Sequence, residues 1–232
     1  MTHPEFVRLP DGVARKAYRR HLVRHATRRA RAVGDRLDVR WVCVAHQLRP
    51  VSAPATVPLL ILSGSVGVGK TTVGSAISGI LAAAEIPHAF VDRDALSSSW
   101  PPVGRFNEEI GYRNLTDVWR NFRDAGATRL ILSGVMETRD DVERCRSAVP
   151  GAAIALCRLQ ASQATREARI RAREVDASRE WHLARTVELE EILEGAELED
   201  FRVQNDGRPA NVVAREVLAR AGWHPPSAER DP

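Results

Sequence analysis

The segment GSVGVGKT, residues 64–71, has the residue types and the spacing of a loop that binds phosphate groups. It matches the Walker A pattern G-x-x-x-x-G-K-[ST], and it follows an apolar stretch and precedes a helical pattern, as that motif requires. Glycines let successive backbone N–H groups point inward around phosphate oxygens, and the start of a helix adds its positive dipole end. Lys70 is one of only two lysines among the 34 basic residues. The motif predicts a site for a nucleoside triphosphate.

This motif also predicts which groups contact the nucleotide and its metal. Lys70 would place its charge on the β- and γ-phosphates as part of the catalytic machinery, and the Thr71 hydroxyl would coordinate Mg²⁺. We predict Mg-ATP as the ligand. The predicted nucleotide-binding residues are Gly64, Ser65, Val66, Gly67, Val68, Gly69, Lys70, Thr71 and Thr72.

A pair of carboxylates follows the next predicted strand, in the segment VDRDAL. Because parallel strands all end at one edge of a sheet, Asp92 and Asp94 would lie at the edge where the phosphate loop binds its ligand. A carboxylate beside Mg-ATP could hold the metal or its waters, or accept the proton of an attacking hydroxyl. The alternative interpretation is a solvated strand end whose aspartate caps a helix.

Arginines recur on the long charged segment TREARIRAREVDASREWHLAR, residues 165–185. Arg166, Arg169 and Arg173 are spaced by three and four residues, so they can share one face of a helix. Such arginines can close over a triphosphate as a lid and offset the charge that develops during transfer. We assign a catalytic role to Arg173 and a nucleotide contact to Arg169. A salt-bridged, solvated helix is the alternative, because acidic residues are interspersed.

Strands and helices that alternate along the chain predict an α/β fold with a parallel sheet covered on both faces. The predicted strands are 59–63, 88–92, 128–133, 152–159 and 200–204, and the predicted helices are 70–84, 113–125, 139–148, 161–195 and a closing helix between Pro209 and Gly222.

Charge and composition divide the chain. Residues 1–50 carry twelve basic and four acidic residues, although the net charge of the whole chain is only +4. We therefore predict a basic extension at 1–50, a proline-containing linker at 51–58, a domain at 59–223 and a disordered tail at 224–232. The extension could be a solvated amphipathic helix or a contact for nucleic acid. It could also be an artefact, with translation starting at Val51 or Val57.

No stretch is long and apolar enough to predict a membrane span, and the N-terminus lacks the apolar core of a signal peptide. Three widely spaced cysteines predict neither disulfides nor a zinc site, so we expect a cytoplasmic protein, monomeric or homodimeric, with no membrane partner.

The phosphate loop and the aspartate pair together resemble the P-loop kinases of small molecules, such as shikimate, gluconate and adenylylsulfate kinases and chloramphenicol phosphotransferase. Residues 57–223 are also similar to uncharacterised actinobacterial ATP-binding, kinase-like proteins, in stretches such as PHAFVDRDAL and NDGRPANVVAREVLARAGW. The resemblance implies a five-stranded sheet in the order 2-3-1-4-5. It also implies that Asp92 serves the Mg²⁺ site and that Asp94 binds the acceptor and acts as its base.

The same resemblance places the loop after the last strand beside adenine, and hence implies nucleotide contacts for Asn205 and Asp206, which would equally suit a turn. Ser133 stands where many P-loop proteins have an aspartate. The sequence therefore leaves two possibilities for the residue that completes the Mg²⁺ site, Ser133 through a metal-bound water and Glu137.

We expect the acceptor pocket among Asp94, the segment SSSWPPVGRFNEEIGYRNL and Gly134, with Arg105 and Arg113 available to pair with an anionic acceptor. Arg113 could instead be a surface helix residue. The predicted function is ATP-dependent phosphoryl transfer to a hydroxyl of a small molecule. The alternative is a nucleotide-dependent regulator that uses the basic extension on nucleic acid and has no metabolite acceptor.

Overall fold

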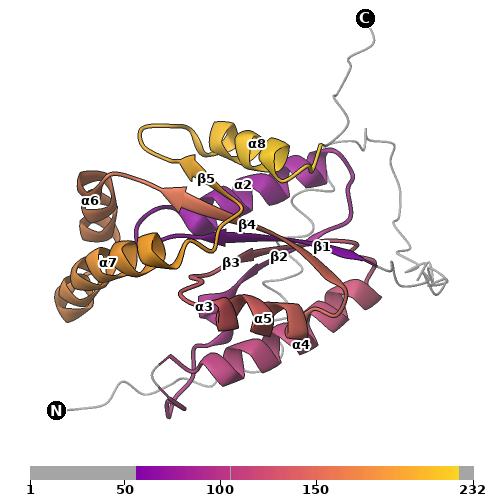
Figure 1. The fold of residues 1–232 in the computed structure, drawn as a ribbon, viewed down its shortest axis with the longest axis horizontal. Coiled ribbons are helices and arrows are strands. Elements are labelled where there is room, and N and C mark those ends of the chain that lie inside the picture. The colour runs from indigo at the N-terminus through magenta and orange to yellow at the C-terminus, as the bar shows by residue number, and fades with distance from the viewer. Residues whose placement is uncertain (1–55, 105, 225–232) are drawn as a thin grey trace, which may run out of the picture. The chain divides into compact units, whose positions relative to one another are not determined.

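The computed structural model describes residues 56–104 and 106–224. The predicted basic extension, Arg105 and residues 225–232 of the predicted tail lie outside these residues. Five parallel strands form one sheet in the order β2-β3-β1-β4-β5, which confirms the predicted fold class and strand order (Figure 1). The strands are β1 (Val57–Ser63), β2 (Ala89–Asp92), β3 (Leu130–Ser133), β4 (Ala152–Gln160) and β5 (Phe201–Gln204).

Helices cover both faces of this sheet. Figure 1 shows α2 and α8 on one face and α3, α4 and α5 on the other, with α6 and α7 together at one end. The helices are α2 (Lys70–Ala83), α3 (Arg93–Leu96), α4 (Glu108–Asp124), α5 (Arg139–Ala148), α6 (Gln163–Arg173), α7 (Asp176–Ala196) and α8 (Ala210–Arg220).

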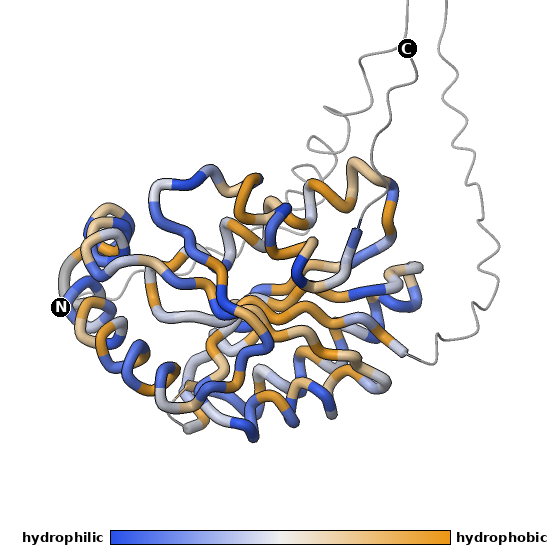
Figure 2. The backbone as a smooth tube through the Cα atoms, turned by 45° about the horizontal axis from the view of Figure 1, so that its top comes forward, coloured by the Kyte–Doolittle hydropathy of each residue, from blue (hydrophilic) through white to orange (hydrophobic). Residues whose placement is uncertain are grey.

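The central strand β1 is apolar without interruption because both of its faces are buried. Leu59, Leu60, Ile61 and Leu62 are all fully buried, as expected for a parallel strand between two helical layers. Figure 2 shows the hydrophobic strands in the middle of the molecule and hydrophilic residues on the outer sides of the helices. Burial on both faces fixes the end of β1, and hence the start of the phosphate loop, rigidly in the sheet.

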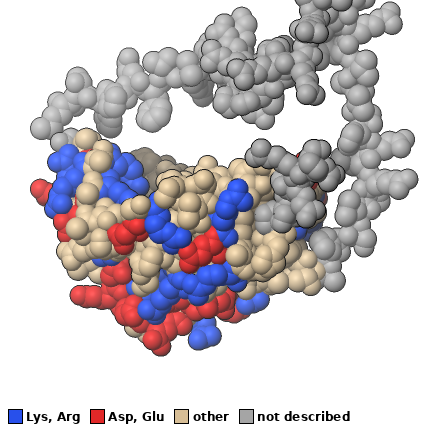
Figure 3. Space-filling model, turned by 90° about the horizontal axis from the view of Figure 1, so that it is seen from above, with Lys and Arg blue, Asp and Glu red and all other residues tan. Residues whose placement is uncertain are grey.

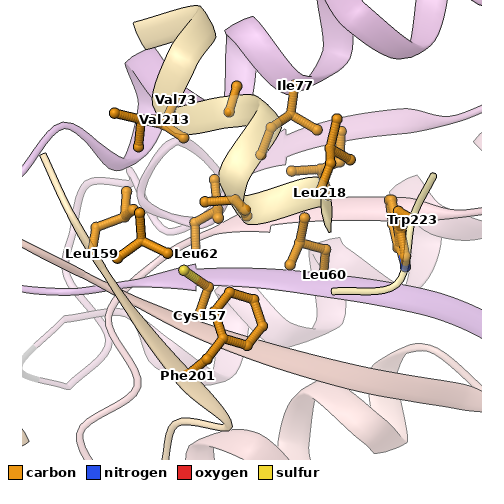
Figure 4. Close-up of a cluster of buried hydrophobic side chains, with 14 of the residues drawn as sticks. Leu60, Leu62, Val73, Ile77, Cys157, Leu159, Phe201, Val213, Leu218 and Trp223 are labelled. Atoms are coloured by element: carbon orange, nitrogen blue, oxygen red, sulfur yellow. The ribbon is translucent and has the colours of Figure 1, made fainter. Parts of the chain in front are cut away.

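One core lies between the sheet and the pair α2 and α8. Figure 4 shows Leu60, Leu62 and Cys157 of the strands packed below side chains of the two helices, including Ile77 and Leu218. A second core joins the other face to α4 and α5, with Trp119 and Tyr112 among its largest members. The sheet edge that carries the site is therefore supported from both sides.

Three element boundaries differ from the prediction. β1 begins at Val57, inside the predicted linker 51–58, because Val57 pairs with Ala152 and its N–H bonds the Gly151 carbonyl at 2.8 Å. α4 begins at Glu108 rather than 113, after Asn107. The predicted helical region 161–195 is two helices, since the backbone is extended at Glu174 and Val175.

The outer surface carries both signs of charge. Figure 3, which views the molecule from above, shows Lys and Arg interspersed with Asp and Glu on that face. Arg208 and Glu216, 2.7 Å apart, are one such pair. Within the described part of the chain, no helix is long and apolar enough to cross a bilayer.

Candidate active site

The loop between β1 and α2 has a conformation that depends on glycine. Gly67 and Gly69 have φ values of 85° and 95°, in the left-handed region that other residues rarely adopt. A Cβ on Gly67 would lie 2.7 Å from the carbonyl oxygen of Arg166. The loop therefore lies directly against the backbone of α6, and a side chain at Gly67 would push the two apart.

Lys70 begins α2 and lines the cavity in front of the loop. Its Nζ donates hydrogen bonds to the carbonyl oxygens of Gly64 at 2.8 Å and Ser65 at 3.1 Å. Burial lowers the pKa of Lys70 to about 8, although Asp94 and Asp92 act in the opposite direction. The ammonium group is thus held by neutral carbonyl groups, and an anionic ligand would stabilise its charge.

The two aspartates have different surroundings. Asp92 accepts a hydrogen bond from the Thr71 hydroxyl at 2.7 Å and one from the backbone N–H of Asp94 at 3.1 Å, so it also caps the short helix α3. Asp94 lines the cavity. Its carboxylate makes no hydrogen bond within residues 56–104 and 106–224, which leaves both oxygens open to a ligand.

Residues suited to hold Mg²⁺ meet beside the loop. The Thr71 hydroxyl touches the Asp92 carboxylate, and Ser133 pairs with Asp92 on the neighbouring strand. Ser133 is 1% exposed, and its hydroxyl has no partner among the described residues. Buried polar groups are normally paired, and a hydroxyl here could bond a water of a hydrated cation.

These residues fit Mg²⁺, which proteins bind through one or two carboxylates, waters and the ligand's own phosphates. In the described segments no group of three His, Cys, Asp or Glu residues could hold an ion by itself. A site shared with a nucleotide has no need of such a group.

The three arginines of α6 have three different positions. Arg166 is buried, and its Nε donates to the Thr186 hydroxyl at 3.2 Å. Arg169 donates to the carbonyl oxygens of Gly67 and Val68, each at 3.2 Å. Of the three, Arg173 alone lines the cavity. In this structure Arg169 therefore contacts the phosphate loop itself, and its contact with a nucleotide remains a prediction.

The loop after β5 also braces the phosphate loop. Asn205 donates from Nδ2 to the Val68 carbonyl at 2.7 Å. Asp206 accepts hydrogen bonds from the backbone and hydroxyl of Ser162, each at 2.9 Å, at the start of α6. Hydrogen bonds from Thr165 and Ser162 lower the pKa of Asp206. The adenine contacts assigned to this loop remain predictions.

Helix α7 contacts the phosphate loop through residues that the sequence analysis did not identify. The Thr186 hydroxyl donates to the Val66 carbonyl at 2.7 Å, and Ser65 donates to Glu190 at 2.5 Å. Glu190 also pairs with the fully buried Arg158 at 3.1 Å. More than a hundred residues separate Thr186 from Val66 and Glu190 from Ser65. In the sequence, only the four-residue spacing of Thr186 and Glu190 indicated that they share a helix face.

A cavity of about 490 Å³ extends from the phosphate loop to the segment 97–107 and α7. Of the four predicted acceptor residues, Asp94 lines it. Gly134 is buried beneath Arg93, whose Cβ is 3.0 Å from where a Cβ of Gly134 would lie. Arg113 is exposed on α4 and does not line the cavity, which favours the surface interpretation. Arg105 lies outside the described residues.

Arg93, which the sequence analysis did not assign to the site, is a cation that lines the cavity together with Asp94. Its Nη1 donates to the Tyr112 hydroxyl at 2.7 Å. Its position in the sequence between Asp92 and Asp94 was the feature that could have predicted its place in the site.

The outer part of the cavity is aromatic. Phe106 and Trp181 meet edge to face, with ring centroids 6.4 Å apart. The Arg185 guanidinium lies 5.4 Å from the centre of the Phe106 ring and pairs with Glu137. Glu137, the second possibility for the Mg²⁺ site, is thus engaged by an arginine on the acceptor side of the cavity.

Asn107 shapes the segment that carries Phe106. It adopts φ 52°, and its side chain accepts from the Val103 N–H at 2.5 Å and donates to the Ser97 carbonyl at 2.9 Å. These bonds tie Asn107 to Val103 and Ser97, and so hold the backbone next to Phe106.

The solved structures that resemble this chain include kinases of small molecules. A gluconokinase from Sinorhizobium meliloti 1021 is 23% identical, with a TM-score of 0.50 over 71% of this chain and 91% of that one. APS kinase from Mycobacterium tuberculosis, solved with AMPPNP and APS, is 17% identical, with a TM-score of 0.51 over 73% and 99%. The fold is that of the P-loop small-molecule kinases.

Other structures with the kinase fold include a tunicamycin resistance protein from Deinococcus radiodurans, 18% identical, with a TM-score of 0.50 over 72% of this chain and 97% of that one. No family model matches the sequence. No curated protein matches it either. At these identities the likeness establishes the fold and leaves the acceptor open.

Proposed function

We propose that this protein is an ATP-dependent phosphotransferase that phosphorylates a hydroxyl group of a small molecule. The observation that carries the proposal is the placement of Asp94. Its carboxylate, which makes no hydrogen bond within residues 56–104 and 106–224, lines the same cavity as Lys70 and Arg173, so a proton acceptor and two cations surround one space. A cavity of about 490 Å³ is the size of a small-molecule site.

In the proposed reaction, the Asp94 carboxylate orients the acceptor hydroxyl and takes its proton as the new bond from oxygen to the γ-phosphorus forms. The bond between that phosphorus and the β,γ-bridging oxygen breaks, and ADP leaves with the electron pair. Lys70 and Arg173 offset negative charge on the transferring group. Because the transition state is loose, positioning and charge contribute more than the base.

Mg²⁺ would be held by Thr71 and Asp92, with Ser133 bonding one of its waters, and would neutralise phosphate charge. The tight contact between Thr71 and Asp92 is the basis for this assignment. AMPPNP in the APS kinase structure supports ATP as the nucleotide. The alternative, a nucleotide-dependent regulator without an acceptor, gives no role to the Asp94 carboxylate or to the cavity beside it.

The proposal is tested by transfer from labelled ATP to a library of hydroxylated metabolites. Labelled product should form with the wild type and disappear with Lys70→Ala. The control is Asp117→Asn, a substitution on the exposed face of α4 outside the cavity, which should retain full transfer. Mg-ATP binding without transfer to any library member, combined with nucleic-acid retention that depends on ATP, would establish the regulator instead.

A further inference from the structure

We infer that the acceptor carries an aromatic ring, which binds against Phe106 and Trp181 while its hydroxyl reaches Asp94. This inference rests on the proposed function for the role of the hydroxyl and deepens it by naming the class of acceptor. It excludes open-chain sugar acids as the preferred acceptors.

The first support is the exposure of Trp181. Half of its surface is open to solvent, although it lines a cavity and its ring contacts Phe106 and His182. Aromatic rings favour edge-to-face or offset contacts with other rings. A solvent-exposed indole at the mouth of a site is a surface on which a ligand ring can lose its water.

The second support is that three polar side chains on this side of the cavity, Arg185, Asn107 and His182, already have partners. Arg185 pairs with Glu137 and with Glu188 at 2.8 Å. The Asn107 amide is used within its own loop, and Nδ1 of His182 contacts the Ser178 carbonyl at 2.7 Å. An open-chain polyol needs many hydrogen-bonding partners to replace water, and these three side chains are already engaged.

The third support is the contrast with the floor of the cavity. The Asp94 carboxylate lines the cavity without a hydrogen-bond partner among the described residues, and Arg93 uses one nitrogen for the Tyr112 hydroxyl. Its other nitrogens make no hydrogen bond within the described segments, so they can donate to a polar group beside the reacting hydroxyl. The partly buried Val135 adds apolar surface to the wall. The cavity is therefore polar where transfer would occur and carries two aromatic rings, Phe106 and Trp181, beyond it.

The test measures binding and transfer separately, with the full-length protein. Saturation-transfer NMR in the presence of Mg²⁺ and AMPPNP would be run on a library of aromatic alcohols and a matched set of open-chain sugar acids and polyols. Aromatic members should bind, and Trp181→Ala should weaken them roughly tenfold to a hundredfold, as expected when an aromatic anchor is truncated. Trp181→Phe should restore most of the affinity.

Phe122→Ala is the matched control, because Phe122 is an exposed aromatic residue on α4 that does not line the cavity. It should bind the aromatic members as the wild type does. The proposal is overturned if no aromatic member binds, if sugar acids bind better, or if Trp181→Ala changes nothing. It is also overturned if Trp181 proves shielded from a quencher in the ligand-free protein, since another part of the chain or a second copy would then cover it.

The two proposals fail in different ways. Aromatic members that bind at Trp181 and receive no phosphate would contradict the kinase function and uphold the aromatic site. Phosphate transfer to sugar acids alone would uphold the kinase function and overturn the aromatic acceptor.

Discussion

Ser65 in the phosphate loop donates a hydrogen bond of 2.5 Å to Glu190 on α7. Glu190 is in turn paired with Arg158 at 3.1 Å and Arg166 at 3.6 Å. One carboxylate thus joins the loop to two buried guanidinium groups. The shape of the loop depends on a charge network behind it as well as on its glycines.

Glu190→Gln should lower the free energy of unfolding by about 1–3 kcal/mol, because it removes the charge that faces two buried arginines. The loss is limited because Arg158 keeps contacts with Glu194 at 2.8 Å and Glu199 at 3.7 Å. Urea unfolding would measure it. Glu191→Gln, at an exposed position on the same helix, is the control and should change stability little. Equal stability of the two variants would show that the network carries no net energy.

Lys70→Ala should weaken Mg-ATP binding by roughly 10²–10³-fold, since it removes a desolvated charge from the phosphate site. The fold should persist, because Lys70 bonds only loop carbonyls. Titration calorimetry gives the affinity, and circular dichroism checks the fold. Undiminished affinity in a folded variant would refute the assignment of the phosphate loop.

The affinity for Mg-ATP should fall as the pH rises. The free protein's Lys70 has a pKa of about 8, and the triphosphate binds its protonated form. Binding therefore raises this pKa and takes up a proton above pH 8, so affinity decreases by up to about tenfold per pH unit there. Calorimetry in two buffers of different ionisation enthalpy would count the protons. Lys70→Ala should lack this uptake, and an identical uptake in that variant would assign it to another group.

Asp94→Asn should retain Mg-ATP affinity and lose transfer by roughly 10²–10⁴-fold, the range for general acid–base catalysis. Asp92→Asn should instead weaken both Mg²⁺-dependent binding and turnover, since its carboxylate contacts Thr71. Initial rates with an identified acceptor and calorimetry with Mg-ATP separate the two effects. Loss of ATP binding in Asp94→Asn alone would exchange the two roles.

Deletion of residues 1–50 should leave Mg-ATP affinity within a few-fold, because residues after Thr56 supply the phosphate loop and two hydrophobic cores around the sheet. The same calorimetric titration on the shortened chain would show it. An insoluble product, or one that does not bind ATP, would make the extension part of the domain.

The sequence was most informative where the signal is local. An apolar strand, a glycine-rich turn and a helix start are adjacent along the chain, so Lys70 and Thr71 could be placed in advance. The strand order came from resemblance, and the structure confirms it. The start of α4 was misplaced because Asn107 precedes it in a left-handed conformation, with no side-chain cap bond of its own to the helix.

Contacts between distant segments could not be predicted in the same way. Arg166, Arg169 and Arg173 have equivalent spacing along α6, and only their surroundings separate them. Arg166 donates a hydrogen bond to Thr186, Arg169 donates to carbonyl oxygens of the phosphate loop, and Arg173 lines the cavity. Glu190 likewise looked like one more acid on a charged helix, because its partner Ser65 lies 125 positions away.

The two faces of α7 limit which sequence changes could alter the acceptor of the proposed kinase. Thr186 and Glu190 hold the phosphate loop, whereas Arg185 and Leu189, each one residue earlier, line the acceptor side. One inserted or deleted residue before Arg185 would rotate these residues by roughly 100°, so that neither set would keep its contacts. Under the proposed function, single replacements at Trp181 and Phe106 can therefore change the acceptor, whereas a change in the length of α7 would also disturb the phosphate loop.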